Sequence, residues 1–190
     1  VIGTVVAPIT TYRPSPGKIL FKDDELGDTV TKVYTGEEIR PDVTVHLDDV
    51  LNTQLNEDEY TLTYADNIKC GAGTVKATGV YPLDDSDENS ISTAFLIVPE
   101  KGNIEKITAG EESITIDVQD QKDSGISGYG VQYREEGVSD WQYEKFGADS
   151  ASLVIKGLTA GKSYEVRACA YIDILTANGE DELNGLYSGE

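Results

Sequence analysis

The sequence has no methionine, one histidine, one tryptophan and two cysteines among its 190 residues. Because it begins Val1-Ile2-Gly3 without an initiator methionine, we expect a processed protein or an excised piece of a longer chain. It also has no run of about 18 apolar residues, which a membrane-spanning helix requires. A piece of a longer chain need not carry a signal peptide, so the lack of one does not indicate a cytosolic location.

Basic residues are scarce: 15 Lys and Arg accompany 35 Asp and Glu, which gives a net charge of −20. Such a surface repels a phosphate backbone and an anionic membrane, and no basic stripe interrupts it. We therefore expect no nucleic-acid binding and no membrane insertion. High negative charge also favours solubility and opposes self-association.

The two cysteines, Cys70 and Cys169, fall in different predicted domains, which excludes a disulfide within one domain. A structural zinc site needs about four ligands, and only His46 could join the two thiols. We expect two isolated thiols and no cofactor. A disulfide between domains or between molecules is the alternative.

Helical periodicity is missing as well. Apolar and polar residues alternate over short runs, such as Val43–Leu47 and Tyr164–Ala170, and Gly, Pro, Asn and Asp separate the runs. The sequence therefore predicts an all-β chain of two tandem β-sandwich domains with almost no helix. The predicted parts are a leader or linker strand at 1–16, a first sandwich at 17–99 and a second sandwich at 100–190.

Three segments of the second predicted domain carry a family resemblance: Gly128–Arg134, Trp141 and Leu158–Arg167. They are similar to the fibronectin type III modules of bacterial surface and secreted proteins. The resemblance implies structural roles for Leu158, Gly161 and Tyr164. A tyrosine at the start of the sixth strand can bury its ring and return its hydroxyl to the backbone of the preceding turn.

The second domain departs from this family in two places. Val118 stands where the family usually has a tryptophan, so the core must be filled differently. The chain also ends at Gly185–Glu190, about where the last strand should begin, and an open sheet edge is normally avoided. One hypothesis is that the strand-like Val1–Val6 of a neighbouring molecule pairs at this edge.

The first domain carries a less specific resemblance, through Tyr34–Gly36, Ile39–Val45, Asp58–Tyr64 and the glycine-bounded run Gly71–Gly79. These segments are similar to bacterial immunoglobulin-like repeats. Both resemblances imply tandem spacer, adhesion or accessory domains outside the cell, and neither implies catalysis.

Catalytic and metal-binding patterns are incomplete. His46 is predicted to face solvent, and no Gly-x-Ser-x-Gly motif accompanies it. The acidic runs 23–25 and 57–59 are predicted to be solvated loops, where a raised carboxyl pKa is not expected. The candidate calcium ligands are Asp85, Asp87 and Asn89, whose spacing resembles an ion-binding loop. Ser90 replaces the glycine that such a loop requires, so a hairpin tip is the preferred interpretation.

The aromatic residues Trp141, Tyr143 and Tyr171 form the candidate ligand surface, because exposed rings can stack on sugars. Phe146 could belong to the same patch, and packing across the sheet is the alternative for Trp141. The leading hypothesis is a non-catalytic spacer or adhesion module of a larger secreted or cell-wall-attached bacterial protein, with an unidentified protein or glycan partner at the cell surface. The alternative is an accessory carbohydrate-binding pair of an extracellular polysaccharide-degrading enzyme.

Overall fold

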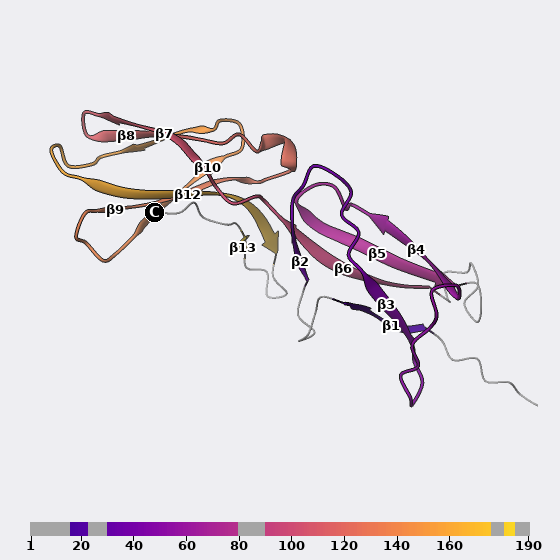
Figure 1. Ribbon diagram of the computed structural model, residues 1–190. Coiled ribbons are helices and arrows are strands. Elements are labelled where there is room, and N and C mark those ends of the chain that lie inside the picture. The colour runs from indigo at the N-terminus through magenta and orange to yellow at the C-terminus, as the bar shows by residue number, and fades with distance from the viewer. Residues whose placement is uncertain (1–15, 23–29, 80–89, 176–180, 185–190) are drawn as a thin grey trace, which may run out of the picture. The chain divides into compact units, whose positions relative to one another are not determined.

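The computed structural model describes residues 16–22, 30–79, 90–175 and 181–184, whose regular structure is almost entirely β-strand (Figure 1). One short 3₁₀ turn, Lys122–Ser124, is the exception among these residues. The predicted all-β fold class is confirmed. No helix of the described part has the length and apolar character needed to cross a membrane.

By its internal contacts the chain divides into two compact units. The first takes the described residues of segments 1–28, 41–64 and 75–93, and the second takes those of segments 29–40, 65–74 and 94–190. Because each unit joins segments that are separate in the sequence, the domain boundaries after residues 16 and 99 stay predictions.

Six strands occupy the described part of the first half. They are β1 (Pro16–Phe21), β2 (Thr31–Val33), β3 (Val43–Leu47), β4 (Tyr60–Ala65), β5 (Gly71–Gly79) and β6 (Ser90–Val98). The sheets have the orders β1-β3 and β2-β6-β5-β4. Strand β2 was not predicted, because three residues are too few to show alternation; it pairs in parallel with the end of β6.

Alternation along the strands builds the core of the first unit. Val43 and Val45 of β3 are buried, while Thr44 and His46 between and after them are partly exposed. The buried members of this core are Ile19, Val43, Val45, Leu55, Tyr60, Val75 and Ala77. They come from β1, β3, β4, β5 and the connection that precedes β4, and apart from the hydroxyl group of Tyr60 their side chains are apolar.

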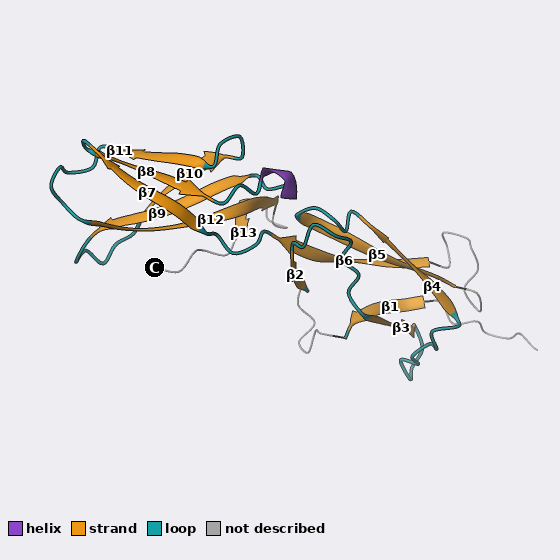
Figure 2. Ribbon diagram, turned by 45° about the horizontal axis from the view of Figure 1, so that its top comes forward, coloured by secondary structure: helices purple, strands orange, loops and turns teal. Residues whose placement is uncertain are grey.

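Seven strands follow in the second half. They are β7 (Ile104–Gly110), β8 (Ser113–Val118), β9 (Gly128–Glu135), β10 (Gln142–Gly147), β11 (Ser152–Lys156), β12 (Tyr164–Leu175) and β13 (Asp181–Asn184). A three-stranded sheet, β11-β8-β7, and a four-stranded sheet, β10-β9-β12-β13, lie in two layers (Figure 2). This half is therefore a two-layered, antiparallel β-sandwich, as predicted.

The core of this sandwich lies between its two layers. Its buried members are Ile116, Val118, Ile126, Tyr129, Val131, Tyr133, Leu153, Ile155, Leu158, Ala168 and Ala170. Val118 lies in the core where a tryptophan was expected from the family resemblance. The rings of Tyr129 and Tyr133, which β9 contributes to the same core, supply aromatic bulk there.

The last strand requires a correction. Strand β13 covers Asp181–Asn184 and pairs with Ile172–Leu175 of β12, so it begins before the predicted start at Gly185. The run Asp-Glu-Leu-Asn has little apolar alternation, which is why the sequence did not indicate a strand there. The leader strand Val1–Val6, and with it the strand-exchange hypothesis, lies outside the described residues.

Candidate functional site

The candidate surface lies on the face of the β10-β9-β12 sheet that points away from the core. On β12, Ala168 and Ala170 face the core, so the alternate residues Arg167, Cys169 and Tyr171 lie on the opposite face. Strand β9 contributes glutamine and arginine to this face but also two glycines, Gly128 and Gly130, over which the rings of Tyr171 and Tyr143 lie close to the sheet.

Trp141 lies immediately before β10, and two guanidinium groups lie over its ring. The Cζ atom of Arg134 is 4.3 Å from the ring centroid, and that of Arg167 is 4.4 Å away. Arg134 also forms an ion pair with Glu165, and Arg167 Nε–H donates to Gln132 Oε1 at 2.6 Å. The surface that a sugar would stack on is thus occupied by the protein's own cations.

The two tyrosines of the predicted ligand surface differ from each other. Tyr143 is 39% exposed, whereas Tyr171 is only 5% exposed although it faces away from the core. Tyr171 packs over Gly128, and the Lys145 ammonium lies 5.0 Å from its ring centroid. Lys145 also lies 3.1 Å from an Asp173 carboxylate oxygen. The expectation of an exposed Tyr171 ring is therefore corrected: outward direction does not ensure exposure where neighbouring side chains cover the sheet.

Phe146, the fourth aromatic residue considered, packs against the core of the sandwich and not on the outer face. The cations that organise the outer face, Arg134, Lys145 and Arg167, were not predicted as site residues. The alternation of β12 already placed Arg167 on the same face as Tyr171. This alternation is the sequence pattern that could have indicated Arg167 as a site residue.

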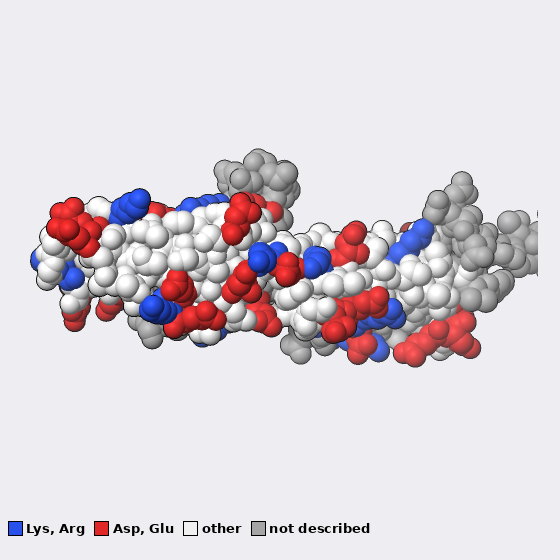
Figure 3. Space-filling model, turned by 90° about the horizontal axis from the view of Figure 1, so that it is seen from above, with Lys and Arg blue, Asp and Glu red and all other residues white. Residues whose placement is uncertain are grey.

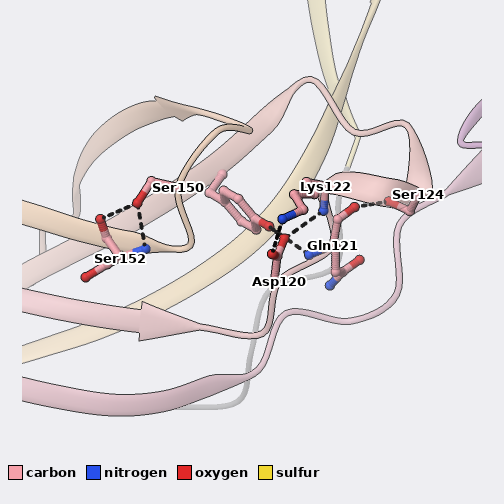
Figure 4. Close-up of polar contacts among 7 residues, drawn as sticks. Asp120, Gln121, Lys122, Ser124, Ser150 and Ser152 are labelled. Carbon is pink, nitrogen blue, oxygen red and sulfur yellow. Dashed lines mark hydrogen bonds and ion pairs between the residues drawn. The ribbon is translucent and has the colours of Figure 1, made fainter.

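A second polar cluster closes the β8–β9 connection and was also missed (Figure 4). The Tyr129 hydroxyl accepts the N–H of Gln121 at 2.8 Å and lies 3.4 Å from Asp120 Oδ1. Asp120 Oδ1 also accepts the N–H of Lys122 at 3.0 Å, and this bond is the main reason that the Asp120 pKa lies below its usual value. Ser124 Oγ–H donates to the Gln121 carbonyl at 2.6 Å.

This second cluster is a loop closure at the end of the core. Burial is the main cause that raises the pKa of the Tyr129 hydroxyl, so Tyr129 stays protonated and bridges the core to the loop. The amide oxygen of Gln121 is buried and has no hydrogen-bond partner among the described residues. The sequence signal was the polar run 119–124, which directly follows a buried strand.

His46 has structural contacts on both ring nitrogens. Nε2 lies 3.1 Å from Thr44 Oγ1, and Nδ1 lies 3.1 Å from the Asn52 carbonyl. The acidic run 57–59 is also used locally, because Glu59 Oε2 accepts the backbone N–H of Asn56 at 2.6 Å. These contacts hold the β3–β4 connection in shape.

The candidate calcium ligands Asp85, Asp87 and Asn89 lie outside the described residues, as does the acidic run 23–25. Among the residues that are described, no group of three or more His, Cys, Asp or Glu side chains is placed to hold a metal ion. On the face shown in Figure 3, carboxylates and basic groups are interspersed.

The residues with predicted structural roles lie together at the start of β12. The Tyr164 hydroxyl accepts the backbone N–H of Thr159 at 3.0 Å. Leu158 is buried in the core of the sandwich, and Gly161 has a φ of +77°, a conformation that L-residues other than glycine rarely adopt. This turn joins β11 to β12.

Neither Cys70 nor Cys169 forms a disulfide bond in the structure. Cys169 is 1% exposed, and Cys70 is partly buried. Burial is the main cause that raises the pKa of Cys70, which lowers its thiolate fraction and its reactivity.

No family model and no curated protein sequence matches the chain. Among solved structures, it is similar to domains A168–A170 of titin, with 15% identity and a TM-score of 0.34 over 83% of this chain. It is also similar to the FN1–FN3 domains of chicken CNTN1, with 8% identity and a TM-score of 0.36 over 94% of this chain. The chain spans 61% and 66% of those two chains. With both TM-scores below 0.5, neither likeness assigns a family or a function.

Proposed function

We propose that the chain is a non-catalytic structural and interaction module, a spacer or adhesion segment of a larger secreted or cell-wall-attached bacterial protein. The observation that carries this proposal is the cation–aromatic packing around Trp141. The groups best suited to bind a ligand, the indole ring with Arg134 and Arg167, contact one another at 4.3–4.4 Å. Side chains that contact one another in this way stabilise a sheet and are not available to bind a substrate.

The polar clusters elsewhere support the same role. Tyr129 and Asp120 close a loop over the end of the core, and His46 holds the β3–β4 connection. An extracellular or cell-surface location rests on the resemblance of Gly128–Arg134 and Leu158–Arg167 to modules of bacterial surface proteins. Antibody labelling of intact source cells tests that location: staining without permeabilisation is expected, and staining only after lysis would contradict it.

Single-molecule stretching tests the spacer role. The chain is held at both ends, and we expect two separate unfolding events. Each event should release about 250–300 Å, because a predicted domain of about 85 residues extends by roughly 3.3–3.6 Å per residue. One event covering the whole chain, or gradual extension at low force, would contradict two mechanically independent domains.

Fluorescence of Trp141, the single tryptophan, separates this role from the glycan-binding alternative. The spacer role predicts that its emission is unchanged by plant or bacterial wall polysaccharides. A saturable shift in emission with one polysaccharide would favour the carbohydrate-binding alternative, because the sugar would have to displace Arg134 or Arg167 from the ring.

A further inference from the structure

The connection between β3 and β4 carries the two most exposed large apolar side chains of the described residues. Val50 is fully exposed and Leu51 is 85% exposed. Single exposed aliphatic residues are ordinary on protein surfaces. Two adjacent ones at the tip of a connection that projects beyond the strands it joins (Figures 1 and 2) form a distinct feature.

These two residues occupy positions that local structure does not favour for them. The N–H of Asn52 donates to the Asp49 carbonyl at 3.0 Å, so Val50 and Leu51 are the central pair of a four-residue turn. Turn centres usually hold Gly, Pro, Asn, Asp or Ser. Residues that break a local preference without gaining burial are expected where a function requires them.

The turn is held firmly by its flanking residues. Asp49 accepts the Thr53 N–H at 2.8 Å and the Thr53 hydroxyl at 2.6 Å, and these bonds keep the Asp49 pKa below its usual value. Thr53 in turn accepts the N–H of Leu47 at 2.9 Å, and His46 Nδ1 contacts the Asn52 carbonyl. A turn that is already ordered loses little conformational entropy on binding.

The charge around the tip decides which partner fits. The tip itself, residues 47–53, contains two carboxylates, Asp48 and Asp49, and no Lys or Arg, whereas Glu57 lies beside Lys22 at the other end of β3. An anionic membrane would repel this segment, and a second copy of a chain with net charge −20 would repel it as well. A protein pocket that is apolar at its base and basic at its rim complements both features.

We propose that Val50 and Leu51 enter an apolar pocket with a basic rim on a partner protein, guided by the carboxylates around them. This inference deepens the proposed interaction role and rests on it. The spacer role does not depend on it, because stretching of the wild-type chain tests that role without any partner.

The first experiment places a photoreactive diazirine leucine at position 51 of the full chain and, as a matched control, at position 138. Val138 is also an exposed aliphatic residue in a turn, since its N–H donates to the Glu135 carbonyl. After illumination with intact source cells, we expect a discrete protein adduct at position 51 that is absent at position 138. An adduct with lipid or with a second copy of the chain, or the absence of any protein adduct, would overturn the proposal.

The second experiment uses the partner protein that cross-linking identifies, purified on its own. Its affinity is measured for three chains: wild type, the double variant Val50→Ser with Leu51→Ser, and Val138→Ser. Because burying one aliphatic side chain is worth about a factor of ten or more in affinity, the double variant should bind at least tenfold more weakly. Val138→Ser should bind like wild type. Added salt and Asp48→Asn should slow association. Equal affinity of wild type and the double variant, with unchanged melting of both, would refute the proposal.

Discussion

Replacing Arg167 or Arg134 by methionine is the sharpest test of the packing around Trp141. Methionine retains most of the aliphatic stem and its packing but removes the guanidinium group. The two arginines lie on different strands, β12 and β9, and both lie over the indole ring. Each substitution therefore removes one cation from the ring and leaves the other in place.

The expected loss follows from the contacts. A cation over a partly exposed tryptophan contributes about 0.5–1 kcal/mol. Arg167 also loses its hydrogen bond to Gln132, worth about 0.5–1.5 kcal/mol, and Arg134 loses an ion pair with Glu165, worth about 0.2–1 kcal/mol. The totals are about 1–2.5 kcal/mol for Arg167→Met and about 0.7–2 kcal/mol for Arg134→Met. At about 4–8 °C per kcal/mol for a domain of this size, both variants should melt several degrees lower.

Thermal melting followed by Trp141 fluorescence reports on this sandwich alone, because the chain has no other tryptophan. Lys162→Met is the matched control: Lys162 pairs with Glu135 at 2.7 Å on the same sandwich and has an exposed side chain. It should lower the melting temperature less than either arginine variant, because it removes only one exposed ion pair and no cation over the ring. If Arg167→Met and Arg134→Met melt like the Lys162 variant, the cation–aromatic contacts do not stabilise the sheet and the reasoning fails.

Three further predictions follow from the same structure. Gly128→Ala should unfold the second sandwich at room temperature, because the alanine Cβ would lie 2.0 Å from the Phe146 carbonyl oxygen. Gly147 pairs with Gly128 and has open space around it, so Gly147→Ala should melt like wild type when unfolding is followed by circular dichroism. Tyr164→Phe should lower the free energy of unfolding by about 1 kcal/mol in urea titration, since it removes the acceptor for the Thr159 N–H; no change would show that this bond is dispensable. Because the hydrogen bonds from Thr53 depress the folded pKa of Asp49, its contribution to stability should be present above its usual pKa of 3.8 and lost as the pH falls through the lower folded pKa. Asp49→Asn should abolish that acid dependence in the amide NMR shift of Thr53.

Period-two alternation predicted β3 and β12 correctly, because successive residues of a strand point alternately toward the core and away from it. Val43 and Val45 are buried on either side of the partly exposed Thr44. In β12 the direction of the side chains alternates but their burial does not, because Ala168 to Ile172 are all buried. Alternation requires about four residues with a contrast in polarity. Strand β2 is too short to show it, and β13 is too polar, so both exist through backbone pairing that the sequence pattern did not indicate.

Exposure on the outer face was harder to predict than direction. Alternation placed Tyr171 away from the core, which is where it lies, but its exposure depends on residues from other strands. Gly128 of β9 lets the ring lie close to the sheet, and Lys145 of β10 covers it. Such cover depends on the register between strands that are 17 to 43 residues apart in the chain. The pattern of residues within one strand does not predict that register. The same limit explains why the two arginines over Trp141 were missed.

The contrast between Trp141 and the Val50–Leu51 tip decides where an interaction is expected. Trp141 is a large ring on an outer face, yet the chain supplies its own cations to cover it. Val50 and Leu51 are smaller, yet the chain orders a turn around them and leaves both in water. Each of these side chains would gain about 1.5–3 kcal/mol on burial, a gain that folding of the described residues leaves unrealised. Since the other described residues do not supply that burial, the tip is the place where a partner adds most.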